Sequence, residues 1–285
     1  MSKFRTNWAS FFRHFVPWFV APRLPPPPAP RFIATIWKSS HLSDGWEDRV
    51  RQFDAISIKA VDKEGFHQIE SARELSAKVR ALGCDVHAWG FHDCVDWNDA
   101  VREARTAVKA VKDLNALAYH WNAEKEWSES SNPPWFASVF AREFKKELPD
   151  VLLFANCFRS PVDAEMISYF DQYEPMLYGT RSSTISTKFD REFARNDLIH
   201  EKMSVMVGTG RLEDGRNTRA WGYLDNVHAS PGLASLVSSH QPRWVNFFRA
   251  GEISGHDMLM DGNDINPSLP EQVVAIKTQL GAGTA

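Results

Sequence analysis

The residues best suited to chemistry lie in the ten-residue segment AYHWNAEKEW at positions 118–127. A short apolar run ends there in Glu124, a carboxylate two residues after the amide of Asn122, with tryptophans on both sides. A carboxyl group in apolar surroundings can keep its proton near neutral pH and act as a general acid. The segment therefore predicts a β-strand that delivers Glu124 to the rim of a pocket. The alternative is that residues 124–126 form a solvated loop after the strand.

Size and composition fit a single large domain. The chain has 285 residues with 43% hydrophobic and 24% charged side chains, which is an ordinary globular composition and close to the size of a (β/α)₈ barrel. The formal net charge of −3 argues against general nucleic-acid binding. Three cysteines, Cys84, Cys94 and Cys157, are few and odd in number, which favours a reducing compartment and shows no metal-ligand spacing. Cys84 and Cys94 bracket a predicted strand, so we expect no bond between them.

The first 31 residues differ from the rest of the chain. They hold five basic residues and no acidic one, whereas the remainder holds 28 basic and 36 acidic residues, a net charge of −8. Aromatic residues recur at three- and four-residue steps over residues 4–19, which predicts a helix with one aromatic stripe. Residues 25–31 are proline-rich, PPPPAPR, and predict an extended spacer.

We therefore divide the chain into an aromatic arm at residues 1–24, a linker at 25–31 and a barrel domain at 32–285. Basic residues interrupt the apolar part of the arm, so no convincing secretion signal is present, and the arm is too short for a transmembrane helix. The arm is expected to dock on a protein partner. A membrane surface and the barrel itself are the alternatives.

After the linker, short β-rich runs alternate with amphipathic helical stretches. The predicted strands are 32–37, 55–60, 86–91, 116–121, 151–157, 174–178, 203–207 and 244–248, and the clearer predicted helices are 66–82, 97–114, 134–148, 188–202 and 270–280. Regular alternation implies parallel strands with right-handed crossovers. The count of about eight predicts an α/β fold of the (β/α)₈ TIM-barrel type. An open doubly wound sheet is the alternative, but no glycine-rich phosphate turn supports it.

Polar side chains follow the predicted strands, where a barrel gathers its active-site residues. They come from nearly every strand: Lys59, Asp62, His87, His92, Asp93, Glu124, Glu126, Asn156, Tyr178, Arg211 and Asn246. His87 and His92 are an odd number of residues apart, so one strand would point them to opposite faces, and we expect no metal site there.

Several of these segments resemble a known family in their order along the chain. ISIKAVDKEG at 56–65 is similar to the second-strand segment I-K-A-T-E-G of family 25 glycoside hydrolases, which are lysozymes and endolysins, and VHAWGFH at 86–92 resembles their third strand, G-A-Y-H-F. Asn122 and Glu124 stand where that family carries D-x-E. PMLY at 175–178 is similar to the M-x-Y of chitinase-like family 18 barrels. Residues 32–37 lack the acid that the family carries on its first strand. Near the position of the family's last aspartate, this sequence has Asn246.

The resemblance implies a glycosidase acting on an N-acetylhexosamine polymer, most of all peptidoglycan, in a protein of phage or prophage origin. Such a protein would be made in the host cytoplasm or carried on the virion, and would act at the cell wall. Glycosidases use two carboxyl groups, but the acetamido oxygen of an N-acetylated sugar can replace one of them. We predict Glu124 as general acid, with Asn122 and Tyr178 orienting the acetamido group. Asp62, Asp93, Asp171 and Glu174 are alternative second carboxylates.

The predicted substrate-binding residues are Lys59, Asp62, Trp89, His92, Asp93, Trp121, Glu126, Asn156, Glu174, Arg211 and Asn246. Trp is abundant, with 11 residues, which suits stacking on sugar rings. No metal and no cofactor is expected. The alternative function is a catalytically inactive barrel that serves a phage particle as a structural or glycan-binding module, attached through its N-terminal arm to a phage structural protein.

Overall fold

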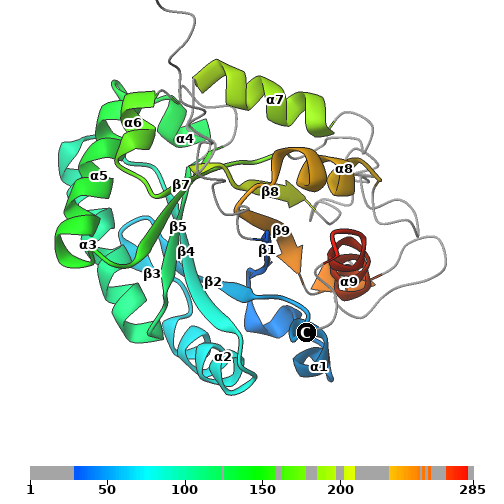
Figure 1. Ribbon diagram of the computed structural model, residues 1–285. Coiled ribbons are helices and arrows are strands. Elements are labelled where there is room, and N and C mark those ends of the chain that lie inside the picture. Colours follow the sequence, from blue (N-terminus) through cyan, green and yellow to red (C-terminus); the bar gives the residue numbers. More distant parts are fainter. Residues whose placement is uncertain are drawn as a thin grey trace, which may run out of the picture.

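The computed structural model describes residues 29–123, 125–157, 162, 164–177, 185–196, 202–208, 231–250, 252–253, 256–257 and 268–281. Parallel strands form the centre of the molecule (Figure 1). They are β1 (Arg31–Ile36), β2 (Ala55–Asp62), β4 (Asp85–His92), β5 (Ala118–Ala123), β6 (Leu152–Cys157), β7 (Gln172–Pro175), β8 (Val205–Gly208) and β9 (Trp244–Ala250).

The strands form a ring. Their hydrogen-bonding order is β7, β6, β5, β4, β2, β1, β9, β8. The two ends of this row meet through parallel bridges from Tyr173 to Met203 and from Met176 to Met206. The backbone N–H of Leu177 also donates to the carbonyl of Met206 at 2.8 Å across this seam. The predicted (β/α)₈ barrel is therefore confirmed.

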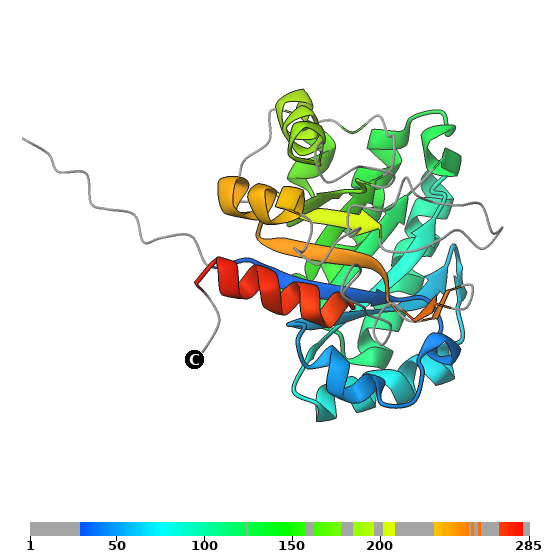
Figure 2. The same cartoon turned by 90° about the vertical axis from the view of Figure 1, so that its right-hand side faces the viewer.

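A helix follows each of these strands and covers the outside of the ring (Figure 1). The helices are α1 (Trp46–Val50), α2 (Ile69–Ala81), α3 (Trp97–Leu114), α5 (Pro133–Glu147), α6 (Ala164–Ser168), α7 (Ile185–Asn196), α8 (Pro231–His240) and α9 (Leu269–Gln279). Shorter elements are η2 (Ser39–His41), β3 (Gly65–Phe66), α4 (Lys125–Ser128), β10 (Glu252–Ile253) and β11 (His256–Asp257). Figure 2 shows α9 lying along β1, where Lys277 lies 3.4 Å from Asp54.

Local sequence explains the best-predicted helix. The side chain of Asp96 accepts a hydrogen bond from the backbone N–H of Asp99 at 2.9 Å, so α3 begins at the expected residue. Asn115 ends the helix in the left-handed conformation, with φ of 47°. Helix α2 begins three residues later than predicted, because Gly65 and Phe66 instead pair antiparallel with the end of β2.

Some other predicted elements need correction. The strand predicted at 174–178 begins earlier, at Gln172, and ends at Pro175. Helices α1, α6 and α8 are absent from the predicted set, because α1 and α6 are only five residues long and α8 is largely apolar without a clear polar face. Residues 1–28, which include the predicted arm and most of the linker, lie outside the described residues.

The core has two parts of different character. Apolar outward-facing residues of the strands pack under the helices in one large cluster. A smaller cluster of Ile33, Ala55, Ala118, Phe154 and Trp244 fills the inside of the barrel near the strand N-termini. The barrel interior is therefore apolar at the N-terminal ends of the strands. Its polar residues lie toward the strand C-termini, where barrel active sites form.

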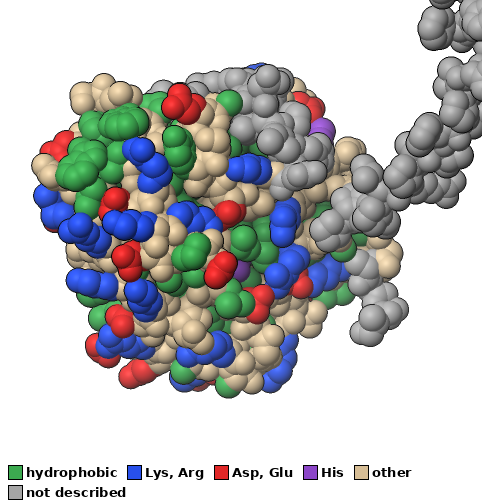
Figure 3. Space-filling model, turned by 60° about the vertical axis from the view of Figure 1, so that its left-hand side comes forward, with side chains coloured by type: hydrophobic (Ala, Val, Ile, Leu, Met, Phe, Trp, Pro, Cys, Tyr) green, Lys and Arg blue, Asp and Glu red, His purple; other side chains and the backbone are tan. Residues whose placement is uncertain are grey.

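The outer surface over the helices is ionic. Figure 3 shows Lys and Arg side chains interspersed with Asp and Glu side chains on one face. Arg73 of α2 bonds both Glu70 and Asp113, and Asp113 belongs to α3, so this arginine links two neighbouring helices. All three cysteines are buried, and none of them is part of a disulfide bond. None of the described helices is long and apolar enough to cross a membrane.

Candidate functional site

The polar interior of the barrel forms one hydrogen-bonded chain. His87 Nδ1 lies 2.9 Å from His120 Nε2, and His120 Nδ1 lies 3.2 Å from Glu174 Oε2. The Asn246 amide donates to the same Glu174 oxygen at 3.1 Å, and its own oxygen accepts from the Thr35 hydroxyl at 2.7 Å. Strands β4, β5, β7, β9 and β1 each contribute one of these side chains. The chain therefore spans the inside of the ring.

Burial favours the neutral form of His87 in this chain. Burial lowers the pKa of His87 well below its ordinary value, and the charges of His120 and Arg31 lower it further. His87 is therefore a neutral imidazole in the folded protein. His120 Nδ1 faces the Glu174 carboxylate, so it is the ring nitrogen placed to donate to Glu174, while Nε2 faces His87.

A small cavity lies beside this chain. Its described lining is Thr35, Ser57, Trp89, His120, Asn122, Asn156, Met206 and Phe248. Only about one water molecule fits inside the enclosed part. The buried oxygen atoms that have no hydrogen-bond partner among the described residues include Ser57 Oγ, Asn156 Oδ1 and Glu174 Oε1, in or beside this cavity. Buried acceptors of this kind call for a partner, which is a water or a ligand group.

Strand pairing places three polar residues in one row. Asn122 on β5 is in register with Asn156 on β6, and Asn156 is in register with Glu174 on β7. Neighbouring strands lie about 4.8 Å apart, so residues in register on the same face are side by side. The row begins two residues before Glu124 in the sequence and ends at a buried carboxylate.

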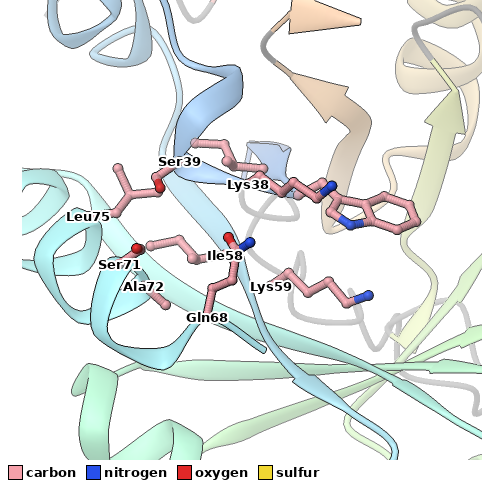
Figure 4. Close-up of a pocket in the computed structure, with 10 residues that line it drawn as sticks. Lys38, Ser39, Ile58, Lys59, Gln68, Ser71, Ala72 and Leu75 are labelled. Carbon is pink, nitrogen blue, oxygen red and sulfur yellow. The ribbon is translucent and has the colours of Figure 1, made fainter. Parts of the chain in front are cut away.

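Lys59 packs against two tryptophan rings at the mouth of the barrel, next to the cavity. Lys59 follows Ser57 on the inner face of β2, and its ammonium lies 4.6 Å from the centre of the Trp37 ring and 5.3 Å from that of Trp89. It also donates to Asp62 at 3.1 Å, where the lysine side chain is 4% exposed and the aspartate 47%. Figure 4 shows Lys59 extending away from the residues of α2 that line the neighbouring pocket. The barrel mouth thus carries one sheltered positive charge.

The structure brings several of the predicted site residues together. Asn122, Asn156 and Trp89 line the cavity, Glu174 and Asn246 belong to the hydrogen-bonded chain beside it, and Lys59 and Asp62 lie at its mouth. Asp93 lies just beyond the end of β4 and pairs with Lys63. Glu124, Tyr178 and Arg211 lie outside the described residues, as does the side chain of Glu126.

Two predicted site residues lie elsewhere. His92 and Trp121 are fully buried on the outer face of the sheet, under α3 and α5. Strand alternation is the reason, because His92 is an odd number of residues from His87, and Trp121 is next to the inward-facing Asn122. His92 and Trp121 therefore lie outside the barrel interior.

His92 instead belongs to a buried polar cluster. Its Nδ1 lies 2.8 Å from Glu103 of α3, its Nε2 lies 2.7 Å from the Tyr119 hydroxyl, and Glu103 also accepts from the backbone N–H of Cys94 at 3.2 Å. Burial would raise the pKa of Glu103, but the hydrogen bond and charge of His92 outweigh it and lower that pKa. Burial also raises the pKa of the Tyr119 hydroxyl well above its usual value. The cluster ties α3 to the loop that carries Asp93.

Sequence patterns assign no role to several residues that build the site. His120, Thr35, Ser57, Met206 and Phe248 form much of the cavity wall. The sequence does contain a clue to His120. It lies two residues before Asn122 on one predicted strand, and alternate residues of a strand face the same side, so His120 should face the barrel interior as Asn122 does. Among the described residues, no group of side chains is arranged to hold a metal ion.

Comparisons with known proteins give a likeness of fold. No family model and no curated protein matches the sequence. A class V chitinase from Nicotiana tobaccum matches with a TM-score of 0.64 and 10% identity, covering 90% of this chain and 99% of that chain. The spore cortex-lytic enzyme SleL of Bacillus megaterium QM B1551 matches with a TM-score of 0.59 and 10% identity, covering 89% and 75%. A chitinase from Bacteroides thetaiotaomicron gives 0.59 and 10%, covering 78% and 90%.

Proposed function

We propose that this protein hydrolyses an N-acetylhexosamine polymer, with peptidoglycan as the preferred glycan and Glu124 as the general acid. One observation carries the proposal: the inside of the barrel is polar at the C-terminal ends of its strands, where β5 leads directly into Glu124. Barrel interiors are ordinarily packed with Val, Ile and Leu. Here Asn122, Asn156 and His120 line a cavity instead.

The chemistry follows from the residues available. Glu124 gives its proton to the glycosidic oxygen as the bond to the anomeric carbon breaks, and the leaving sugar departs as an alcohol. The acetamido oxygen of the sugar that carries this anomeric carbon attacks it and forms a cyclic intermediate, so no second carboxylate is needed as a nucleophile. Asn122 and Tyr178 orient the acetamido group. Water then opens the cyclic intermediate, with the Glu124 carboxylate accepting its proton.

Two kinds of likeness support the substrate class. The structures with this fold include chitinases and a spore cortex-lytic enzyme, and a mutant of the tobacco chitinase was crystallised in complex with NAG4. The motifs at 56–65, 86–92 and 122–124 resemble family 25 lysozymes. This second likeness favours peptidoglycan over chitin, and with it action at the cell wall.

Release of soluble muropeptides from purified peptidoglycan tests the proposal. We expect Glu124→Gln to lower the rate by about 100-fold or more, because it cannot supply the proton. Glu129→Gln, which changes an exposed acid five residues later, is the matched control and should keep the wild-type rate. Equal release by wild type and Glu124→Gln rules out Glu124 as the acid.

One observation favours the alternative function, that of a barrel without catalytic activity. The described cavity holds only about one water, and the polar side chains beneath it are mostly bonded to each other, as in a barrel that has lost catalysis. The protein would then be a structural or glycan-binding module of a phage particle. Retention on insoluble peptidoglycan without muropeptide release would favour this function over hydrolysis.

The N-terminal arm completes either function by attaching the barrel to a partner protein. Residues 1–24 are basic and aromatic and precede a proline-rich spacer. We propose that the partner is a phage structural protein. Capture of partners by the full chain and by a variant lacking residues 1–30 tests this, and unchanged capture by the deletion variant contradicts it.

A further inference from the structure

The N-terminal face of the barrel carries the same hydrogen-bonded contact at two places. At the first, the backbone N–H of Phe32 donates to the Asp54 carboxylate at 2.7 Å, and the Asp54 N–H donates to the Phe32 carbonyl at 2.9 Å. At the second, the Leu153 N–H donates to the Asp171 carboxylate at 2.7 Å, and the Asp171 N–H donates to the Leu153 carbonyl at 2.9 Å. Each aspartate therefore ties the start of its own strand to the strand before it.

A lysine near the end of a helix completes each contact. Lys277 of α9 lies 3.4 Å from the Asp54 carboxylate, and Lys145 of α5 lies 2.5 Å from that of Asp171. Both lysines stand two residues before the last residue of their helix. The four side chains are only 23% to 34% exposed, so solvent screens these ion pairs less than pairs on the open surface. We call each set of aspartate, lysine and strand N–H a latch.

The chain around the two latches repeats as well. Each latch aspartate follows a buried phenylalanine, Phe53 or Phe170, and each Phe-Asp pair closely follows a helix of five residues, α1 or α6. The Phe53 ring lies 6.1 Å from the Phe247 ring on β9, and the Phe170 ring lies 5.5 Å from the Trp121 ring on β5. In the chain order of the barrel strands and helices, every part of one latch has its counterpart four strand–helix units away.

The repeat reaches the barrel interior. Three residues after the strand positions that carry the latches, Thr35 and Ser57 stand at one latch and Asn156 and Glu174 at the other. Thr35 is in register with Ser57, and Asn156 is in register with Glu174, and all four are buried. The cavity takes its lining from β1, β2, β4 and β5 on one side and from β6, β8 and β9 on the other. The candidate site therefore lies between two equivalent sets of strands.

We propose that the barrel is a duplicated half-barrel, with β1 to α5 as one half and β6 to α9 as the other, and that the two latches are equivalent clasps that hold the halves together around the candidate site. The lysine of each half reaches the aspartate of the other half, which is the reciprocal pattern of a two-fold symmetric interface. When one clasp opens, the other keeps the ring closed. The inference does not depend on the proposed function, because it concerns how the halves are joined.

Hydrogen exchange of the full chain tests the clasps and requires no activity. We expect Lys277→Met to speed amide exchange about fivefold at the start of β1 and β2, and Lys145→Met to do the same at the start of β6 and β7, because each loses a partly buried ion pair. Lys112→Met, which removes a lysine that is 56% exposed and 3.7 Å from Glu147, is the matched control and should change neither region. A lysine variant that leaves exchange at its own latch unchanged overturns the inference.

The double variant separates clasps from local ion pairs. With both lysines replaced, no intact latch holds the ring while the other opens, so exchange at each latch should exceed its single-variant change by about twofold or more. Two local pairs that do not join the halves would give each region only its single-variant change, which contradicts the inference. If a lysine variant does not fold, Asp54→Asn and Asp171→Asn keep an acceptor for the strand N–H and remove only the charge. They should give the same pattern with smaller changes.

Discussion

The Nδ1 atom of His120 lies 3.2 Å from the Oε2 atom of Glu174, and both side chains are completely buried inside the barrel. The two residues are 54 positions apart in the sequence and come from β5 and β7. This pair connects the strand that precedes the proposed acid to the one buried carboxylate described in its row. Because both side chains are buried, replacing either of them should change the free energy of unfolding.

Breaking this pair should destabilise the protein. Replacing His120 with Leu leaves Glu174 with the Asn246 amide as its remaining donor, and we expect the free energy of unfolding to fall by about 3 kcal/mol. Urea denaturation measures this change. The double variant His120→Leu with Glu174→Met should lose less than the sum of the single changes, by about 1 kcal/mol or more, because no buried charge remains unpaired. Additive effects would show that the two residues are not coupled.

Gly90 should not tolerate a side chain. A Cβ atom there would overlap the Tyr119 hydroxyl, lie 2.6 Å from the Val61 Cβ and lie 3.0 Å from His92 Nε2. We expect Gly90→Ala to lower the free energy of unfolding by about 3 kcal/mol, because the buried strand backbone has to shift. Gly65→Ala is the matched control, since its new Cβ would meet only a carbonyl oxygen at 3.6 Å. A similar melting temperature for the two variants would contradict the prediction.

Glu103 should make stability depend on acid pH. Its pKa is lowered in the folded protein from an ordinary value of 4.5, so the unfolded chain takes up this proton at higher pH than the folded one. The stabilising contribution is complete above about pH 4.5 and is lost as the pH falls through the folded pKa.

The measurement is the free energy of unfolding between about pH 6 and about pH 3. Glu103→Gln should start less stable and lose less over this range than the wild type. Glu70→Gln, at an acid whose side chain is 78% exposed, should follow the wild-type curve. Parallel curves for wild type and Glu103→Gln would exclude the linkage.

Lys59 should favour acidic glycans. Its ammonium lies at the barrel mouth, and the lactyl carboxylate of N-acetylmuramic acid is a group that it can pair with when Asp62 turns toward solvent. We expect Lys59→Met to reduce muropeptide release by about tenfold while changing the cleavage of neutral chitin oligomers by less than threefold. Lys78→Met, on the exposed side of α2, controls for loss of charge. Equal losses on both substrates would remove Lys59 from selectivity.

The sequence determined the elements of this protein well. The limits of α3 follow from the cap at Asp96, the apolar spacing within the helix and the stop at Asn115, all of which are local. Alternation in 86–92 likewise predicts opposite faces for His87 and His92, and the barrel places them on opposite faces. Local signals fail where pairing overrides them, as at Gly65 and Phe66, which join β2 and delay the start of α2.

The site itself was only partly accessible from the sequence. Asn122 could be selected from the sequence, because it is polar and lies two residues before Glu124 on the same predicted strand, so both side chains should face the same side. The pairing of His120 with Glu174, and of Glu174 with Asn246, could not, because these contacts depend on strand register and ring closure. Register is set by the packing of the whole barrel, so the tertiary structure alone decided which buried acid lies in the row that leads to Glu124.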